Sequence, residues 1–180
     1  MKHAGLPHER FMVRYERNQY FTGRRSLLKK IFKDFQDVAA PPYRGRIALF
    51  GLGGTGKTQV ALEYVYHYQS WYSRIYWISA DSQKSVLDGY ERIAKRAELP
   101  IPSDSKAIDI AGRVISWLRL EQKWLMVIDN LDDISVLSTR NFGRADVDTL
   151  LPPIGPDRHT LESLRRNTRT RSRSLAIQST

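Results

Sequence analysis

Apolar residues recur along this 180-residue chain in two different patterns. Some stretches place an apolar residue every three or four positions, which is the spacing of a helix with one buried face. Other stretches are short and apolar throughout, which is typical of strands buried on both faces. The first pattern predicts helices over 26–35, 57–69, 82–97 and 107–120, and the second predicts strands over 46–50, 74–79 and 124–128.

The predicted helices and strands alternate, and prolines interrupt the chain at Pro41-Pro42, Pro100 and Pro102. Strands without a polar face need cover on both sides, which a parallel sheet with helices on both faces supplies. The sequence therefore predicts an α/β fold with three layers and a parallel sheet.

The formal net charge of +10 is concentrated at the two ends of the chain. Residues 1–33 carry +7 and residues 158–180 carry +5, whereas residues 34–157 carry −2. Basic ends around a near-neutral body indicate solvated arms rather than a groove shaped for DNA, so no nucleic-acid partner is expected. We predict a basic arm over 1–20, one core domain over 21–157 and a disordered tail rich in Arg, Ser and Thr over 158–180.

Three absences bear on where the protein acts. The sequence has no cysteine, no apolar run long enough to cross a membrane, and no apolar segment of a secretory signal near its first residue. They predict a cytoplasmic, intracellular protein without disulfides and without a membrane partner.

One motif carries a specific chemistry. Residues 51–58, GLGGTGKT, match the pattern G-x-x-x-x-G-K-[ST] and lie between a predicted strand and a predicted helix. Glycines let the backbone turn its N–H groups toward a phosphate, the lysine supplies a positive charge, and the last threonine offers a hydroxyl to Mg²⁺. The residues predicted to bind the phosphates of ATP or ADP are Gly51, Gly53, Gly54, Thr55, Gly56, Lys57 and Thr58.

A second magnesium ligand is predicted where a later strand ends. Asp129 follows the apolar run 124–128, about 70 residues after the glycine-rich motif, and P-loop NTPases hold Mg²⁺ at this place. Thr58 and Asp129 are therefore the predicted metal ligands. Asp132 and Asp133 follow closely and are the predicted catalytic residues, because a carboxylate can orient or deprotonate water.

Five segments together resemble the STAND ATPases of the NB-ARC and NACHT type, and fungal members most closely. They are FTGRR at 21–25, the glycine-rich motif at 51–58, IYWISA at 75–80, WLMVIDNLDD at 124–133 and LPP at 151–153. The resemblance implies that Phe21, Gly23 and Arg24 line the adenine side of the nucleotide pocket. Arg25 departs from the family, which usually has an acid at that position.

The resemblance also implies a switch rather than a metabolic enzyme. In such proteins ADP holds a resting state, and exchange for ATP permits homo-oligomerisation and signal transduction. We expect ATP hydrolysis by this chain to be slow or absent.

One part of the family pattern is not evident in the sequence. A further strand should lie between the P-loop strand and the magnesium strand and end in a sensor of the γ-phosphate. Residues 158–164, RHTLESL, would have to form it, yet they contain Glu162 and little of the Val and Ile that a central strand needs. Instead of a Thr-Thr-Arg sensor the chain has Ser163-Leu164-Arg165-Arg166. We therefore expect an incomplete sheet, in a chain truncated or mis-spliced near His159.

Alternatives to a signalling switch use the same phosphate motif. A small-molecule or nucleotide kinase would need a lid and an acid that binds the acceptor. An AAA-type ATPase that acts on DNA is favoured by the basic ends and disfavoured by the near-neutral body, and a binding fragment without hydrolysis is favoured by the missing sensor. A GTPase is disfavoured because the sequence has no guanine-reading N-K-x-D.

Overall fold

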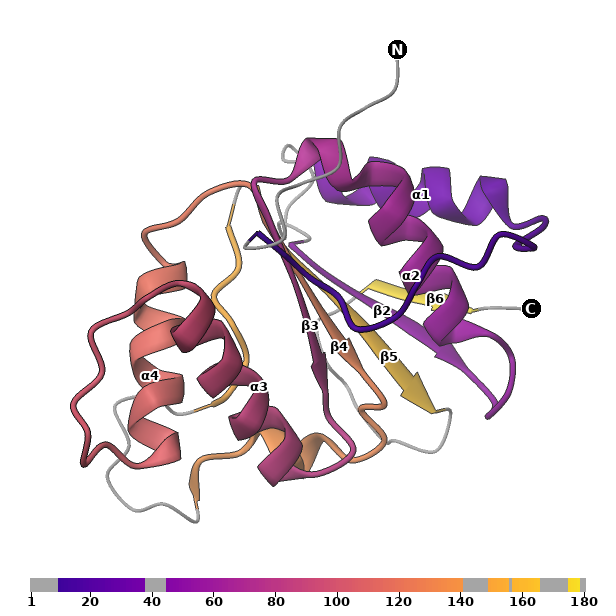
Figure 1. The fold of residues 1–180 in the computed structure, drawn as a ribbon. Coiled ribbons are helices and arrows are strands. Elements are labelled where there is room, and N and C mark those ends of the chain that lie inside the picture. Colours follow the sequence, from indigo (N-terminus) through magenta and orange to yellow (C-terminus); the bar gives the residue numbers. More distant parts are fainter. Residues whose placement is uncertain (1–9, 38–44, 141–148, 156, 166–174, 179–180) are drawn as a thin grey trace.

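A single parallel sheet forms the centre of the computed structural model, which describes residues 10–37, 45–140, 149–155, 157–165 and 175–178 (Figure 1). The strand order across the sheet is β1-β3-β4-β5-β2-β6, and every neighbouring pair is parallel. The strands are β1 (Phe11–Met12), β2 (Arg46–Gly51), β3 (Arg74–Ser79), β4 (Trp124–Asp129), β5 (Arg158–Arg165) and β6 (Leu175–Gln178).

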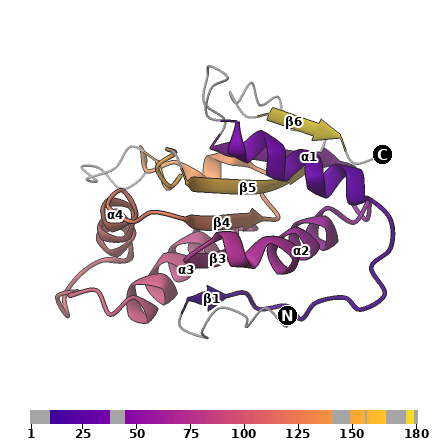
Figure 2. The same ribbon diagram turned by 90° about the horizontal axis from the view of Figure 1, so that it is seen from above.

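Helices cover both faces of the sheet, as Figure 2 shows from above. On one face lie α1 (Arg25–Gln36) and α2 (Lys57–Tyr68), and on the other lie α3 (Gln83–Arg96) and α4 (Ala107–Leu118). Two 3-10 turns complete the described elements, η1 (Gln69–Trp71) and η2 (Ile134–Leu137). Every helix and strand predicted from the hydrophobic pattern is present, with ends within two residues of those predicted. The α/β fold with three layers is confirmed.

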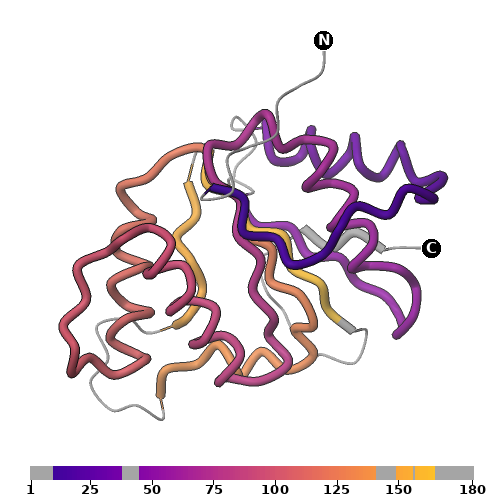
Figure 3. The backbone as a smooth tube through the Cα atoms, in the orientation of Figure 1, coloured from indigo at the N-terminus to yellow at the C-terminus, as the bar shows by residue number. Residues whose placement is uncertain are grey.

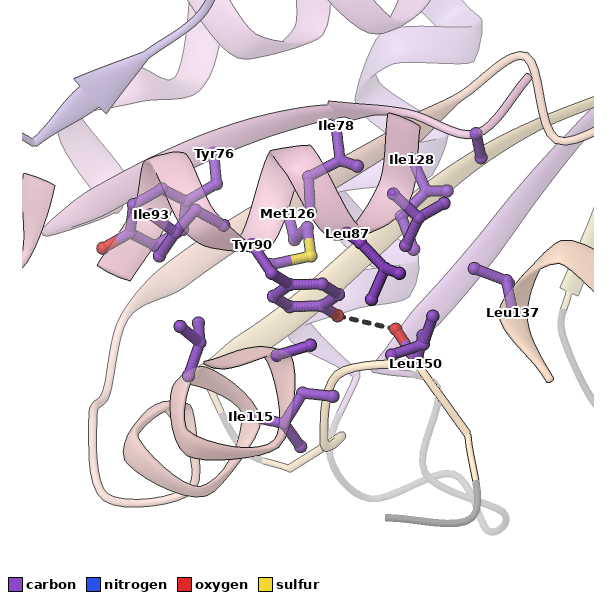
Figure 4. Packing of buried hydrophobic residues seen from close by; sticks show 14 of the residues in the cluster. Tyr76, Ile78, Leu87, Tyr90, Ile93, Ile115, Met126, Ile128, Leu137 and Leu150 are labelled. Atoms are coloured by element: carbon purple, nitrogen blue, oxygen red, sulfur yellow. Dashed lines mark hydrogen bonds between the residues drawn. The ribbon is translucent and has the colours of Figure 1, made fainter. Parts of the chain in front are cut away.

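Each face of the sheet has its own hydrophobic cluster because successive strand residues point to opposite faces. Ile47 and Leu49 of β2 pack toward α1 and α2, whereas Ala48 packs toward α3 and α4. In the second cluster the ring of Tyr90 lies among apolar side chains of α3 and the sheet, and its hydroxyl donates a hydrogen bond of 2.6 Å to the carbonyl of Leu150 (Figure 4). This bond ties Leu150 to α3.

The expectation of a missing central strand is wrong. β5 runs between β4 and β2, with Leu161 in register with Val127 on one side and with Ile47 on the other. Burial of its polar side chains is possible because other residues supply partners. Glu162 Oε1 lies 3.2 Å from Arg46 Nε, and His159 Nδ1 lies 3.1 Å from the hydroxyl of Tyr72.

The strand β5 also corrects the border of the predicted tail. Residues 158–165 belong to the centre of the sheet, and 175–178 form the edge strand β6 beside β2. Other residues of the predicted tail, 166–174 and 179–180, lie outside the described ranges. The truncation hypothesis thus loses one of its two premises, the absence of this strand.

Residues 13–24, which we call the strap, run from β1 to α1 along the outside of α2 (Figure 3). Arg17 makes a bidentate ion pair with Glu63, with distances of 2.7 and 3.1 Å. Closer to the start of α2, the Asn18 side chain donates to Gln59 at 3.3 Å. The predicted basic arm is therefore packed on the domain from residue 10 onward, and residues 1–9 lie outside the described ranges.

In the described part of the chain, none of the helices is both long enough and apolar enough to pass through a membrane.

Candidate functional site

The glycine-rich loop connects the last residue of β2 to the first turn of α2. Gly54 and Gly56 have φ angles of 77° and 80°, in the left-handed region that side chains disfavour. Gly56 is also the N-cap of α2, so the positive end of the helix faces the loop. Local backbone requirements therefore explain these glycines, and they produce an anion-binding turn.

The side chain of Lys57 folds back over this loop and is almost fully buried. Its ammonium group donates to the carbonyls of Gly51 at 3.0 Å and Leu52 at 2.9 Å. The hydroxyl of Thr55 donates to the same Leu52 carbonyl at 2.9 Å. A positive charge is thus held above the backbone amides of the loop, where it can interact with phosphate oxygens.

Thr58 and Asp129 meet although they lie 71 positions apart in the sequence. The Thr58 hydroxyl donates a hydrogen bond of 3.0 Å to Asp129 Oδ1. The Asp129 side chain is 1% exposed, and its Oδ2 has no hydrogen-bond partner in the described part of the structure. A buried carboxylate oxygen without a partner is costly. A hydroxyl beside an available carboxylate oxygen is a donor set that suits Mg²⁺.

A pocket of about 250 Å³ opens beside Thr58 and next to Asn130, the residue that follows Asp129. Its lining joins the loop to the ends of two neighbouring strands and consists of Gly53, Gly54, Gly56, Lys57, Thr58, Asn130, Asp132 and Ser163. Ser163 lies near the end of β5, and its carbonyl accepts a hydrogen bond of 3.0 Å from the Leu131 amide. Sequence reasoning did not identify Ser163 as a site residue. Its position at the end of a strand beside β2 and β4 was the available signal.

The two predicted catalytic carboxylates lie in different surroundings. Asp132 lines the pocket. Asp133 does not, because its carboxylate caps η2 and accepts hydrogen bonds from the Ser135 amide at 2.8 Å and the Ser135 hydroxyl at 2.7 Å. These bonds, the one from the backbone amide first, lower the pKa of Asp133. Within the described lining, only Asp132 of this pair is placed near the phosphate loop.

Gly23 and Arg24 lie at the end of the strap, with φ angles of 76° and 51°. This turn directs the Arg24 side chain toward the phosphate loop, where Nη2 donates to the Thr55 carbonyl at 3.0 Å. The Nη1 atom of Arg24 is buried and has no partner among the described residues. Phe21 lines a separate cavity of about 620 Å³ between the strap, α1 and α2. The geometry thus links Arg24 directly to the loop, whereas Phe21 lies further away along the strap.

A curated protein of the fungus Hyaloscypha variabilis, described as a nucleotide-binding leucine-rich repeat (NLR)-like protein, is 30% identical to this chain over 131 residues. The aligned part is 71% of this chain and 13% of that protein, so the chain spans a small part of its relative's length. No family model matches the chain.

Two solved structures share the fold. Cdc6p from Pyrobaculum aerophilum is 18% identical with a TM-score of 0.56, over 86% of this chain and 42% of its own. The ORC2 protein of Aeropyrum pernix, solved as ADPNP and ADP complexes, is 16% identical with a TM-score of 0.52, over 85% and 43%. Together with the loop and strand order, these likenesses establish the fold of a nucleotide-binding P-loop domain.

Proposed function

We propose that this chain is the adenine-nucleotide switch domain of a larger NLR-like signalling protein. The observation that carries the proposal is the buried Asp129 carboxylate. Its Oδ1 accepts from Thr58 of the glycine-rich loop, while its Oδ2 has no hydrogen-bond partner among the residues that the structure describes. A phosphate-binding loop and a buried acid in this arrangement suit a nucleotide bound together with Mg²⁺. The likeness to an NLR-like protein and the family pattern of the sequence support the signalling context.

The phosphates of ADP or ATP would lie against the loop backbone and the Lys57 ammonium group. Mg²⁺ would be held by Thr58 and Asp129. Arg24 reaches the loop from the strap, and its buried Nη1 has no partner within the described ranges, which supports a role on the nucleotide side of the pocket.

For hydrolysis, Asp132 is the residue that we propose to orient water, because it lines the pocket and Asp133 does not. Hydrolysis is proposed to be slow, so that the bound nucleotide sets the state of the protein. Exchange of ADP for ATP would then change the equilibrium between a resting and an assembling form.

Calorimetric titration of the chain with ADP, ATP and GTP tests nucleotide binding. We expect ADP and ATP to bind with Mg²⁺ present and GTP to bind far more weakly. Lys57→Ala should abolish binding, because it removes the charge above the loop. Lys84→Ala is the matched control, since Lys84 is an exposed lysine of α3 away from the pocket. Equal affinity of the wild type and Lys57→Ala for ATP would refute the proposal.

Two further variants test the metal and the water. Chelation of Mg²⁺ should weaken ATP binding by the wild type but change little in Asp129→Asn, which lacks the ligand charge. Phosphate release from ATP should fall in Asp132→Asn and stay unchanged in Asp133→Asn. The opposite result for these two acids would mean that Asp133, and not Asp132, orients the water. Rapid phosphoryl transfer to a small-molecule acceptor would favour a kinase instead.

A further inference from the structure

Another cavity lies away from the phosphate loop. It has a volume of about 1200 Å³, and we call it the distal groove. One wall is the chain from β1 into the strap, the other is the last turns of α3, and β3 residues lie between them. The parallel strands begin near the distal groove and end near the phosphate loop. The two cavities therefore lie at opposite ends of the strands.

Positive charge dominates the distal groove. Its acids are Glu16 and Glu98, and its basic residues are Arg10, Arg14, Arg74, Arg92, Lys95 and Arg96. Arg74 is neutralised by Glu121 at 3.2 Å and lies 5.2 Å from the centre of the Trp117 ring. The other five cations are exposed, and none has an ion-pair partner within the described ranges.

Helix stability explains part of this cluster. Lys95 and Arg96 lie in the last turn of α3, where cations interact favourably with the negative end of the helix. Arg10, Arg14 and Arg92 do not lie in a last helical turn. Like charges that converge on one groove repel one another, and an anion bound between them removes that cost.

We propose that the distal groove binds an acidic peptide segment of a protein partner. Arginine predominates among the groove cations, and its planar guanidinium pairs with carboxylates through two hydrogen bonds. One wall is the edge strand β1 with the strap and the other is the end of α3, and a groove between two such walls suits an extended chain. The proposal therefore specifies a short segment rich in Asp and Glu.

Two observations favour an acidic peptide over a nucleic acid. Of the four aromatic rings at the groove, Trp77 is buried and Phe11 and Tyr66 are only partly exposed. Contacts of Phe11 with Tyr66 at 5.3 Å and of Tyr15 with Trp77 at 5.5 Å hold the rings at an angle to one another, which disfavours stacking on successive bases. Residues 34–157 carry a net charge of −2, so the body of the domain offers no long basic track for a phosphate backbone.

Fluorescence anisotropy of the 180-residue chain with a labelled peptide of alternating Glu and Gly tests the proposal. Arg92→Glu/Arg96→Glu should weaken binding by about tenfold or more, because two cations of the groove are reversed. The control, Arg113→Glu/Arg119→Glu, reverses two exposed cations of the α4 region and should change affinity by less than about twofold. Lys57→Ala should bind the peptide like the wild type, which separates this result from the nucleotide experiment.

The comparison probe is an oligothymidylate with the same net charge as the peptide. Tighter binding of this DNA, lost in the groove variant, would overturn the proposal in favour of a nucleic acid. Equal losses in groove and control variants, or no peptide binding by the wild type, would also overturn it. Circular dichroism checks that each variant is folded, and Arg10→Glu/Arg14→Glu on the opposite wall replaces the α3 variant if that one is unfolded.

Discussion

Residues 124–129 of β4 and 159–164 of the neighbouring central strand β5 are all buried, but the two segments have very different sequences. Residues 124–128 of β4, WLMVI, are apolar, and only its last residue, Asp129, is charged. In β5 the buried residues include His159, Thr160, Glu162 and Ser163. The difference teaches that a strand can be central without an apolar sequence, provided that neighbouring elements supply partners for its polar groups.

The partners of β5 come from distant parts of the chain. Arg46 of β2 pairs with Glu162, and its Nη2 also donates to the Pro152 carbonyl at 3.0 Å. His159 stacks on Phe35 of α1 with 4.4 Å between ring centres. The hydroxyl of Thr160 has no partner in the described part of the chain. The cost of burial is thus offset to different extents along one strand, which can be measured residue by residue.

The largest expected effect tests whether β5 is as much a part of the core as β4. Leu125 of β4 and Leu161 of β5 are both fully buried in the cluster under α1 and α2. Truncation of either leucine to alanine should lower the free energy of unfolding by about 2–5 kcal/mol. Urea denaturation of Leu125→Ala and Leu161→Ala measures both. A much smaller loss for Leu161→Ala would mean that β5 contributes little to the folded core.

The next effect concerns the pH dependence of stability, because burial shifts the pKa values of two groups of β5 in opposite directions. Burial raises the pKa of Glu162 to about 7, with Arg46 opposing the shift. Its contribution to stability is present at low pH and is lost as pH rises through 7. Burial lowers the pKa of His159 to about 4. The stability due to its neutral form is present above about pH 6.5 and is lost as pH falls toward 4.

These opposing contributions should leave the wild type with little change in stability between about pH 4.5 and 6.5. Glu162→Gln should show stability that rises with pH over this range and then stays level. His159→Gln should show stability that falls by about 3 kcal/mol as pH rises toward 7. Urea midpoints across pH measure these slopes, and parallel profiles for the three proteins would contradict the assignment.

A smaller effect separates the ion pair from the apolar packing around it. Arg46→Met leaves Glu162 buried without its partner and should lower the free energy of unfolding by about 2 kcal/mol near neutral pH. The loss is smaller than for a fully enclosed ion pair because Arg46 is partly exposed. The double variant Arg46→Met/Glu162→Leu replaces both charges and should recover most of that loss. Thermal and urea unfolding of both proteins give the comparison. A double variant no more stable than the single one would show that the charges themselves are required.

The smallest effect is expected at Thr160. Valine has the same shape without the hydroxyl, and removal of a buried polar group that has no partner should leave stability unchanged or raise it by up to about 1 kcal/mol. Urea denaturation of Thr160→Val measures this change. A clear loss of stability would show that the threonine hydroxyl makes a stabilising hydrogen bond.

The hydrophobic pattern predicted the helices and the strands β2, β3 and β4 because these signals are local. A repeat of three or four residues, or a run of apolar residues before a glycine, can be identified within one segment. The glycine-rich loop and Asp129 were identified for the same reason, since each follows a predicted strand. Neighbouring parallel strands end on the same side of a sheet, so these segments were expected to meet. The Thr58 hydroxyl and Asp129 Oδ1 lie 3.0 Å apart.

Tertiary structure alone decided β5, the contact of Arg24 with Thr55 and the separation of Asp132 from Asp133. Glu162 argues against a buried strand when its own segment is considered, and the fold compensates by bringing Arg46, far away in the sequence, within 3.2 Å of it. Ser135 removes Asp133 from the pocket through hydrogen bonds that the motif does not specify. Sequence by itself determined what each segment favours locally, whereas the pairing of polar groups across the fold depended on which segments became neighbours.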